Sequence, residues 1–466
     1  MALQFILGSS GSGKTEYLYE KILKDAGEKP ERMFYVIVPE QFTMQTQKEL
    51  VSRQKNHAIM NIDVVSFDRL AYRIFDELGI QDLVVLEDTG KNLILRKLAA
   101  DHQKKLTALK HNISRMGYID QVKSLISEFM QYGFSPEDLR EYLEKEKDMS
   151  ALDYKLKDIL LLYEAFADYM KGRFVTSETL LGVLADCASR SGLLKDAVLA
   201  FDGFTGFTPV QMELMGSLMK TAGDIYVTCC IDIHGELYGD RGIQELFYMS
   251  RKMLRALEKT ARESDCQVKD PILIQGEKGR FADNPALSHL ERNLFRPKGG
   301  TYRLQDRGDR PPAVSLYSLS SPREELLFAV AKIRELTGKY GFRYNEIAIV
   351  SGNAQGYEKY APEIFEMYDI PWFSDTKESI LFHPFIEWIR SVMEMLEKDF
   401  SRESVFRYLR SGLARFTMEE TDLLENYVLE RGIRGFKKWN EKWVHPSRIS
   451  GRGVRVSQEE WLSRQE

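Results

Sequence analysis

The sequence predicts an α/β protein whose centre is a parallel β-sheet. Three apolar runs of strand length, residues 3–7, 32–38 and 62–65, are each followed by a segment with helical spacing of its apolar side chains. Parallel strands need such crossover helices, and strands buried on both faces have continuous apolar runs. The strand pattern returns at residues 197–202 and 224–231, so we expect one sheet whose sequence is interrupted by an insertion.

The block between these two parts of the sheet has the pattern of long amphipathic helices. Apolar side chains at positions 119, 122, 126, 129 and 130 share one helical face, and those at 159, 160, 163, 166 and 169 share another. We therefore assign residues 1–79 together with 196–295 to the first domain, and residues 80–195 to a helical insertion. The aromatic side chains on these two faces are expected in the core.

The second half of the chain predicts a further α/β unit. Residues 296–312 contain GGTYRLQDRGDRPP, which is typical of a linker. Strand patterns at 313–319, 346–350 and 370–373 alternate with helical patterns at 322–340 and 357–368. Residues 313–400 therefore indicate the start of a second α/β domain, and residues 401–466 a helical region. The chain stops in mid-pattern, as a truncated polypeptide does.

Composition indicates a cytoplasmic protein without a membrane segment. The 466 residues carry 65 basic and 70 acidic side chains, and no apolar run is long enough to cross a bilayer. The net charge of −5 excludes a uniformly basic surface but leaves room for a local basic groove. The cysteines have neither the spacing nor the histidine neighbours of a zinc site, and we expect buried thiols at Cys187, Cys229, Cys230 and Cys266.

The stretch GSSGSGKT at residues 8–15 predicts a phosphate-binding loop. It lies between a strand pattern and a helical pattern, which is the order that the chemistry requires. Glycines let backbone N–H groups surround the phosphates, and the helix N-terminus adds its partial positive charge. We expect Lys14 to reach the β- and γ-phosphates of ATP, and the Thr15 hydroxyl to bind Mg²⁺. The predicted nucleotide-binding residues are Gly8, Ser9, Ser10, Gly11, Ser12, Gly13, Lys14 and Thr15. The alternative is a glycine-rich turn without a ligand.

Asp202 is the second predicted Mg²⁺ residue, because it ends a strand pattern in the same sheet. An acid in this position holds the metal of a P-loop NTPase. An active ATPase normally has a glutamate next to it that orients the attacking water, and here the next residue is Gly203. Loss of such assistance typically costs about 10²–10⁴-fold in rate. We therefore predict nucleotide binding without rapid hydrolysis. The alternative is that Asp202 only caps the turn before Gly203.

These motifs, in their order, resemble one family: the AddB subunit of the bacterial AddAB helicase–nuclease, whose N-terminal part is similar to a UvrD-type helicase of superfamily one. The resemblance spans nearly the whole chain. It is carried by FILGSSGSGKT (5–15), VPEQFT (38–43), VVSFDRLAYRI (64–74), FDGFTGFTPVQ (201–211), YSLSSPREEL (317–326), residues 343–375 and LLENYVLERGIRGFKKW (423–439). Active helicases have Asp-Glu where this chain has Asp202-Gly203.

The resemblance implies a RecA-like first domain, a second RecA-like domain and a role in DNA processing. Such subunits form a heterodimer with an AddA-type helicase–nuclease subunit, help to resect double-strand breaks and to recognise a Chi sequence, and thread the single-stranded 3′-ended strand. They also carry a C-terminal nuclease domain with an iron–sulfur cluster held by four cysteines. The four cysteines of this chain do not match that C-terminal pattern. We therefore expect the cluster only in a C-terminal region that this chain lacks.

The resemblance also indicates residues that flank single-stranded DNA. These are Gln41, Phe42, Thr43, Phe67 and Arg69. An aromatic ring such as Phe42 or Phe67 can stack on a base, while Arg69 can meet a phosphate. Phe67 fits a core position at a strand-to-helix junction equally well, and Arg69 an exposed helix charge.

Three functions are consistent with these patterns. The first is a DNA-handling subunit that holds ATP and Mg²⁺ without acting as a motor. The second is an active superfamily-one helicase, against which stand Gly203 and the lack of an upstream glutamine segment. The third is a P-loop kinase for small molecules, which needs neither the helical insertion nor a second α/β unit.

Overall fold

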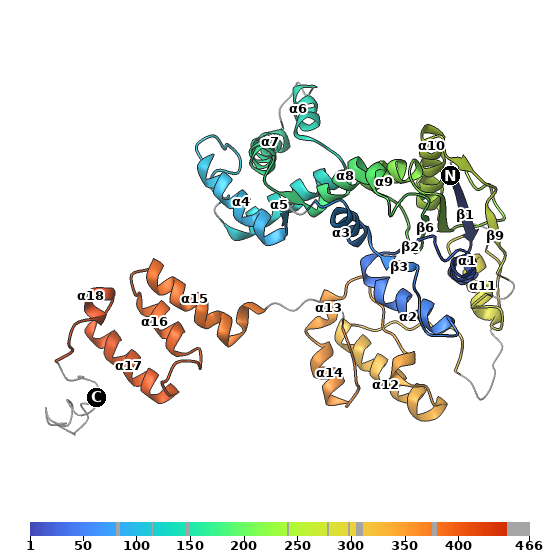
Figure 1. Ribbon diagram of the computed structural model, residues 1–466. Helices are drawn as coiled ribbons and strands as arrows, with labels where there is room; N and C mark the ends of the chain where they lie inside the picture. Colours follow the sequence, from blue (N-terminus) through green and yellow to red (C-terminus); the bar gives the residue numbers. More distant parts are fainter. Residues whose placement is uncertain are drawn as a thin grey trace. The chain divides into compact units, whose positions relative to one another are not determined.

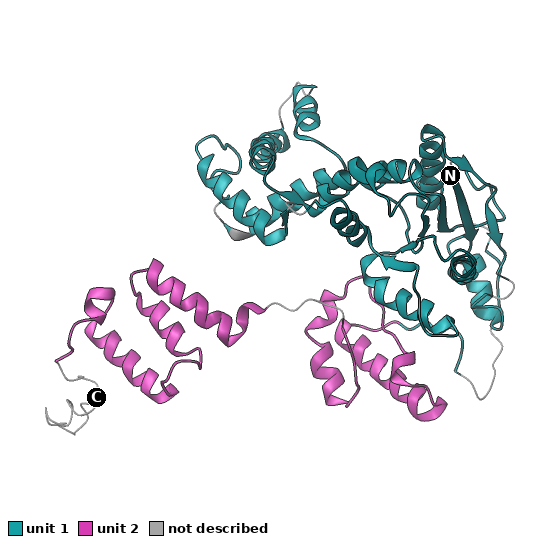
Figure 2. Ribbon diagram, viewed as in Figure 1, with its two compact units in different colours: residues 1–317 teal, residues 318–466 magenta. Residues whose placement is uncertain are grey.

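A computed structural model describes residues 1–80, 84–113, 115–145, 150–239, 242–276, 279–296, 299–303, 311–374 and 380–444. The chain divides into two units, Met1–Tyr317 and Ser318–Glu466 (Figures 1 and 2). Within the described ranges, no helix combines the length and the apolar character that a bilayer crossing requires. The α/β class that the sequence predicts is confirmed, because the first unit is built on a parallel sheet.

The sheet of the first unit has the strand order β3-β2-β6-β7-β1, and both β8 and β9 pair with β1 beyond it. Every pairing is parallel, with Gly8 opposite Cys230 and Ile37 opposite both Val65 and Phe201. The strands are β1 (Ala2–Gly8), β2 (Phe34–Ile37), β3 (Ile62–Val65), β6 (Val198–Phe201), β7 (Asp224–Cys230), β8 (Gln267–Val268) and β9 (Ile272–Ile274). The five longest strands lie where the sequence predicts them.

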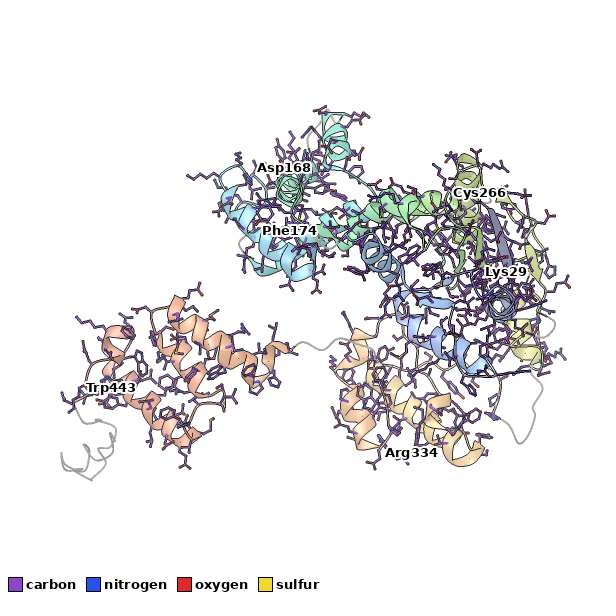
Figure 3. The ribbon with its side chains drawn as sticks, viewed as in Figure 1. Lys29, Asp168, Phe174, Cys266, Arg334 and Trp443 are labelled. Carbon is purple, nitrogen blue, oxygen red and sulfur yellow. The ribbon has the colours of Figure 1, made fainter. Side chains whose placement is uncertain are left out.

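Helices cover both faces of this sheet, so β1, β2, β3, β6 and β7 are largely buried, whereas the short edge strands β8 and β9 are partly exposed (Figure 1). On β1, Phe5 faces one core while Ile6 faces the other, as strand geometry requires. One face is covered by α1 (Lys14–Glu28) and α2 (Thr43–Arg53); the other by α3 (Phe67–Glu77), α8 (Ser177–Cys187), α9 (Pro209–Met219) and α10 (Tyr248–Glu263). Side chains fill the space between the sheet and these helices (Figure 3).

The helical insertion has its own core. A short parallel pair, β4 (Val85–Leu86) and β5 (Val175–Thr176), stands at its two ends. Between them lie α4 (Asp88–Asp101), α5 (Met116–Gln131), α6 (Pro136–Lys145) and α7 (Ala151–Met170). The predicted aromatic side chains pack inside, and Phe174, labelled in Figure 3, stacks on Tyr169. Helix α8 follows but packs on α3 and α9, so it belongs to the core of the sheet.

The remaining elements are short turns and the helices of the second unit. The first unit also contains η1 (Glu40–Phe42), η2 (Ala188–Arg190) and α11 (Pro285–Asn293). The second unit contains α12 (Pro322–Tyr340), η3 (Tyr344–Glu346), α13 (Gln355–Glu358), α14 (Ala361–Met367), η4 (Ile380–Phe382), α15 (Pro384–Glu397), α16 (Arg402–Leu409), α17 (Met418–Arg431) and α18 (Phe436–Trp439). One small core joins α12 to α14, and another joins α16 to α17.

The strands predicted at 313–319, 346–350 and 370–373 are not formed. Leu316, Val350 and Phe373 are 97%, 92% and 88% exposed. A strand depends on a neighbouring strand for its backbone hydrogen bonds, and no strand is present among the described residues of 318–444. The apolar pattern alone therefore gave a wrong prediction for these three segments.

Candidate functional site

The predicted phosphate loop connects β1 directly to α1. The strand ends at Gly8 and the helix begins at Lys14. Gly11 and Gly13 have φ angles of 69° and 104°, which favour glycine over any residue with a side chain. Gly13 is the N-cap of α1, and because glycine has no side chain, the N-cap residue does not accept a hydrogen bond from the first N–H groups of this helix. These N–H groups and the helix dipole give the loop the features of an anion site.

Lys14 places its ammonium group within the loop. Its Nζ donates a hydrogen bond to the Ser9 carbonyl oxygen at 2.7 Å. Ser12 is buried beneath the loop, and its Oγ has no hydrogen-bond partner. The loop therefore brings together a cation and backbone donors, which is the combination that a polyphosphate needs.

A segment that sequence reasoning missed packs against the outside of this loop. A Cβ atom on Gly8 would lie 2.8 Å from the carbonyl oxygen of Ile274, its partner in the last residue pair of β1 and β9. A Cβ on Gly279 would lie 2.6 Å from the Gly11 carbonyl oxygen. The N–H of Arg280 donates to that same oxygen at 2.8 Å. Two backbone segments thus approach so closely that only glycine fits between them.

Asp202 lies beside Thr15, as its predicted role requires. Thr15 Oγ1 donates to Asp202 Oδ2 at 2.9 Å and is 3.2 Å from Oδ1. Thr228 Oγ1, on the neighbouring strand β7, donates to Asp202 Oδ1 at 2.5 Å. The carboxylate is buried, and these hydroxyl groups hold it in place. Thr228 was not among the predicted site residues, because a threonine inside an apolar strand carries no motif.

The Thr15 and Asp202 oxygens fit Mg²⁺. Magnesium prefers hard oxygen ligands, and it is commonly bound by one or two carboxylates together with substrate phosphates and water. Among the residues that the structure describes, no cluster of three or more histidine, cysteine, aspartate or glutamate side chains can hold a metal. A magnesium ion at Thr15 and Asp202 therefore depends on the phosphates of a nucleotide for its remaining ligands.

Tyr19 extends this cluster away from the phosphate loop. It lies one helical turn after Thr15 on α1 and is 2% exposed. Its hydroxyl is 3.4 Å from Asp202 Oδ2 and 3.2 Å from Thr46 Oγ1 on α2. Burial, together with the charge of Asp202, raises the pKa of this hydroxyl, so it stays protonated. Sequence reasoning missed Tyr19 because it lies beyond the loop motif.

Gly203 turns the chain away from β6 in a conformation that suits glycine. Its φ angle is 81°, and a Cβ atom there would meet Pro39 Cδ at 3.6 Å. The position at which active helicases have glutamate therefore has a backbone conformation that favours glycine. An L-residue here would be strained by the backbone, whatever space surrounds it.

The predicted DNA-flanking residues fall into two groups. Gln41 is exposed, Phe42 is 44% exposed, and Arg69 is exposed with an ion pair to Glu40 at 3.1 Å. Thr43 is buried and its Oγ1 donates to the Glu40 carbonyl oxygen. Because β2 and β3 are adjacent and parallel, the segments that follow them meet at one edge of the sheet.

Phe67 is 6% exposed and belongs to the core. Its ring packs on an aromatic cluster formed by Phe201, Phe204 and Phe207, with centroid distances of 5.8, 5.4 and 6.1 Å. Of the two alternatives that the sequence left open, this burial favours the core position. Phe42 is the exposed aromatic residue of the pair.

The chain is similar to known proteins over nearly its whole length. The family model described as ADDB, N-terminal, matches residues 5–291. The chain is 38% identical over 447 residues to the B-type subunit of the ATP-dependent helicase/deoxyribonuclease of Lachnoclostridium phytofermentans, covering 95% of this chain and 38% of that protein. It is 33% identical over 442 residues to the protein of the same name from Acetivibrio thermocellus, again covering 95% and 38%. The chain thus spans less than half the length of these relatives.

Proposed function

Because the chain belongs to the AddB N-terminal family, we propose that it is the N-terminal, helicase-like part of the B-type subunit of an ATP-dependent helicase/deoxyribonuclease, and that it holds ATP, Mg²⁺ and DNA without acting as a motor. The relatives bear that subunit name and are more than twice as long as the matched part. The observation that carries the nucleotide half of this proposal is the contact between Thr15 and Asp202, next to Gly203.

In this proposal each residue of the loop has one task. The N–H groups of residues 8–13 and the α1 N-terminus hold the phosphates, and Lys14 neutralises the β- and γ-phosphate charge. Thr15 and Asp202 hold Mg²⁺, which neutralises phosphate charge when it is bound. Thr228 keeps the Asp202 carboxylate in position. None of these residues activates water.

The absence of a motor follows from Gly203. Hydrolysis requires a group that orients or deprotonates water next to the γ-phosphate, and glycine offers neither. The acid that lies against Thr15 in the described part of the chain is Asp202, whose oxygens already accept from the Thr15 and Thr228 hydroxyl groups. The bound nucleotide then has a structural or regulatory role.

The DNA half of the proposal rests on the edge formed by the segments after β2 and β3. Gln41, Phe42 and Arg69 are exposed there, and we assign Phe42 to base stacking and Arg69 to a phosphate. Thr43 supports the turn that carries Phe42. The strand that binds is the 3′-ended one, in a heterodimer with an AddA-type subunit that resects double-strand breaks and responds to Chi. We assign the nuclease and its iron–sulfur cluster to no residue of this chain, which matches 38% of the length of these relatives.

Two measurements on the purified chain test this function. A fluorescent ATP analogue is titrated with and without Mg²⁺, and hydrolysis is followed with and without single-stranded DNA. We expect Mg²⁺-dependent binding that Lys14→Ala abolishes, and negligible DNA-stimulated turnover. Rapid turnover abolished by Lys14→Ala supports an active helicase instead, and phosphoryl transfer to a nucleoside or sugar supports a kinase. Co-elution with an AddA-type subunit tests the partner.

A further inference from the structure

The Tyr19 hydroxyl has one proton and two possible acceptors. Asp202 belongs to the proposed nucleotide site, and Thr46 lies next to the residues assigned to DNA, so Tyr19 connects the two proposed binding sites. Its hydroxyl lies within hydrogen-bond distance of Asp202 Oδ2, at 3.4 Å, and of Thr46 Oγ1, at 3.2 Å. Tyr19, Thr46 and Asp202 are all buried, so water does not substitute for either partner. A single O–H can donate to one of the two oxygens at a time.

Thr46 belongs to the first turn of α2. This helix follows the turn at residues 40–42, which we call the DNA-flanking turn. The helix starts at Thr43, directly after η1, in which Gln41 and Phe42 are exposed. Thr43 Oγ1 donates to the Glu40 carbonyl oxygen, and Glu40 forms the ion pair with Arg69 on α3. The buried side of this helix start therefore contacts Tyr19, and its exposed side carries the residues assigned to DNA.

We propose that Tyr19 is a positioning residue that couples nucleotide occupancy at the phosphate loop to the affinity of the DNA-flanking turn through Thr46. The inference rests on the proposed binding of Mg²⁺-nucleotide and single-stranded DNA. With the Asp202 carboxylate facing no cation, the negative oxygen is the stronger acceptor for the Tyr19 proton. With Mg²⁺ bound, the Asp202 carboxylate would be a weaker acceptor, and the Tyr19 hydroxyl would donate to Thr46 Oγ1 instead.

The change in proton direction alters how α2 is held at its start. When Tyr19 donates to Asp202, Thr46 can only donate its own proton to the Tyr19 oxygen or to the helix backbone. When Tyr19 donates to Thr46, the same 3.2 Å contact between α1 and α2 runs in the opposite direction, and the Thr46 proton is released from it. The two states therefore differ in the direction of the hydrogen bond that holds the first turn of α2. A ligand on one side thus changes the affinity on the other side, and the effect is reciprocal.

The test is a thermodynamic cycle in the full chain. The dissociation constant of a labelled single-stranded oligonucleotide is measured without nucleotide and with a saturating, non-hydrolysable ATP analogue and Mg²⁺. We expect the two constants of the wild type to differ by about 5- to 150-fold, the usual range of coupling between two sites. Tyr19→Phe keeps the buried ring and removes the hydroxyl, and it is expected to bring the two constants within about twofold of each other, below the lower limit of that range.

Matched variants separate coupling from a structural role. Tyr17→Phe, two residues away on the exposed side of α1, is expected to keep the wild-type coupling. Thr46→Val is expected to lose it, and Thr46→Ser to retain it because the hydroxyl is preserved. A residue that only stabilises the fold would change the melting temperature and leave the ratio of the two dissociation constants unaltered.

The result that overturns the inference is a coupling ratio that survives in both Tyr19→Phe and Thr46→Val, or a wild type that binds both ligands without any coupling. Failure of the proposed function has a different signature, because the wild type then does not bind the nucleotide or the oligonucleotide alone. The single-ligand titrations, carried out first, distinguish these outcomes.

Discussion

Thr15 and Asp202 are 187 residues apart in the chain, and the Thr15 hydroxyl donates to the Asp202 carboxylate at 2.9 Å. The parallel sheet makes this contact possible, because β1 and β6 both end at the edge where α1 begins. A hydroxyl and a carboxylate at this distance supply two adjacent oxygen ligands. The helical insertion lies between them in sequence without separating them in space.

Replacing Asp202 with asparagine is expected to remove the Mg²⁺ dependence of nucleotide binding. The amide keeps the shape of the side chain but not its charge, so affinity with Mg²⁺ should fall roughly 10–150-fold, which corresponds to the 1.5–3 kcal/mol of a charged hydrogen-bonded group. Affinity without Mg²⁺ should change little. Titration of an ATP analogue at several Mg²⁺ concentrations measures both. Asp101→Asn, an exposed carboxylate on α4, is the control. Equal Mg²⁺ dependence in both variants contradicts the assignment.

Phe67→Ala and Phe42→Ala should have opposite effects. Loss of the buried Phe67 ring should lower the free energy of unfolding by about 3–5 kcal/mol, because it leaves a cavity in an aromatic cluster. Loss of the exposed Phe42 ring should leave stability nearly unchanged and weaken binding of single-stranded DNA by roughly 5–150-fold, equivalent to the 1–3 kcal/mol of base stacking. Urea unfolding and oligonucleotide titration distinguish the two roles. A stable Phe67→Ala protein with impaired DNA binding would reverse the assignment.

Gly279→Ala tests the close approach of two backbones at the phosphate loop. The added Cβ would lie 2.6 Å from the Gly11 carbonyl oxygen, so the loop or the segment that covers it must move. We expect a loss of stability of about 1–3 kcal/mol, as in other overpacked sites, together with weaker nucleotide binding. Thermal unfolding and titration with an ATP analogue measure these changes. Gly27→Ala, at the end of α1, is the control, because the added Cβ meets no atom within 4 Å. It should lower neither the stability nor the nucleotide affinity. Wild-type nucleotide affinity in Gly279→Ala would show that the loop is not constrained there.

Gly203→Glu should not create a fast ATPase. The substitution supplies the carboxylate that active helicases have, but the φ angle of 81° disfavours any L-residue by about 1–2 kcal/mol. The introduced glutamate side chain would therefore project from a strained backbone, and we do not expect this backbone to direct it toward the γ-phosphate of bound ATP. DNA-stimulated hydrolysis is the measurement. Gly182→Ala on α8, where nothing lies within 4 Å, is the stability control. A large gain in turnover would mean that the missing acid alone had silenced a motor.

The two neighbouring cysteines at the end of β7 should differ in reactivity. Burial raises the pKa of the Cys229 thiol to about 11, whereas Cys230 is exposed, so the expectation of a buried thiol was wrong for Cys230. The thiolate is the reacting form, and a raised pKa keeps Cys229 neutral until the pH approaches that value. Alkylation followed by mass spectrometry at about pH 7.5, below the ordinary thiol pKa, should label Cys230 first, and the rate at Cys229 should rise only as the pH increases toward 11. Equal labelling of both near neutral pH would contradict the burial of Cys229.

The sequence predicted best the segments in which a single physical requirement, such as burial on both faces, determines the residue types. The runs that became β1, β2, β3, β6 and β7 are buried on both faces, so most residues in them are apolar enough to be recognised. The loop from Gly8 to Lys14 was equally clear, because a positive φ angle at Gly11 and Gly13 demands glycine. Thr15 and Asp202 could be paired in advance because both follow strands of one parallel sheet.

Contacts between distant segments could not be predicted from local patterns. Tyr19 and Thr228 became part of the site through the packing of α1 and β7, and nothing in their immediate sequence marks them. The close approach of Gly279 to Gly11 joins two segments that are far apart in the sequence, which no period or motif encodes. The strand predictions for residues 346–350 and 370–373 were wrong for a related reason. The composition of these segments suits a strand, but strand formation depends on a partner strand outside the segment.

The order of strands sets the distance between the two proposed ligands. From β1, which leads into the phosphate loop, to β2, which leads into the DNA-flanking turn, the sheet passes through β7 and β6. Three intervals of about 4.8 Å give a span of roughly 14 Å across one hydrogen-bonded layer. Such a layer has no hinge between the two ends, so we expect the distance between the ends of β1 and β2 to change little when ligands bind. Within this domain, communication between them has to occur by reorientation of side chains and of single helix turns, and not by closure of one lobe on another.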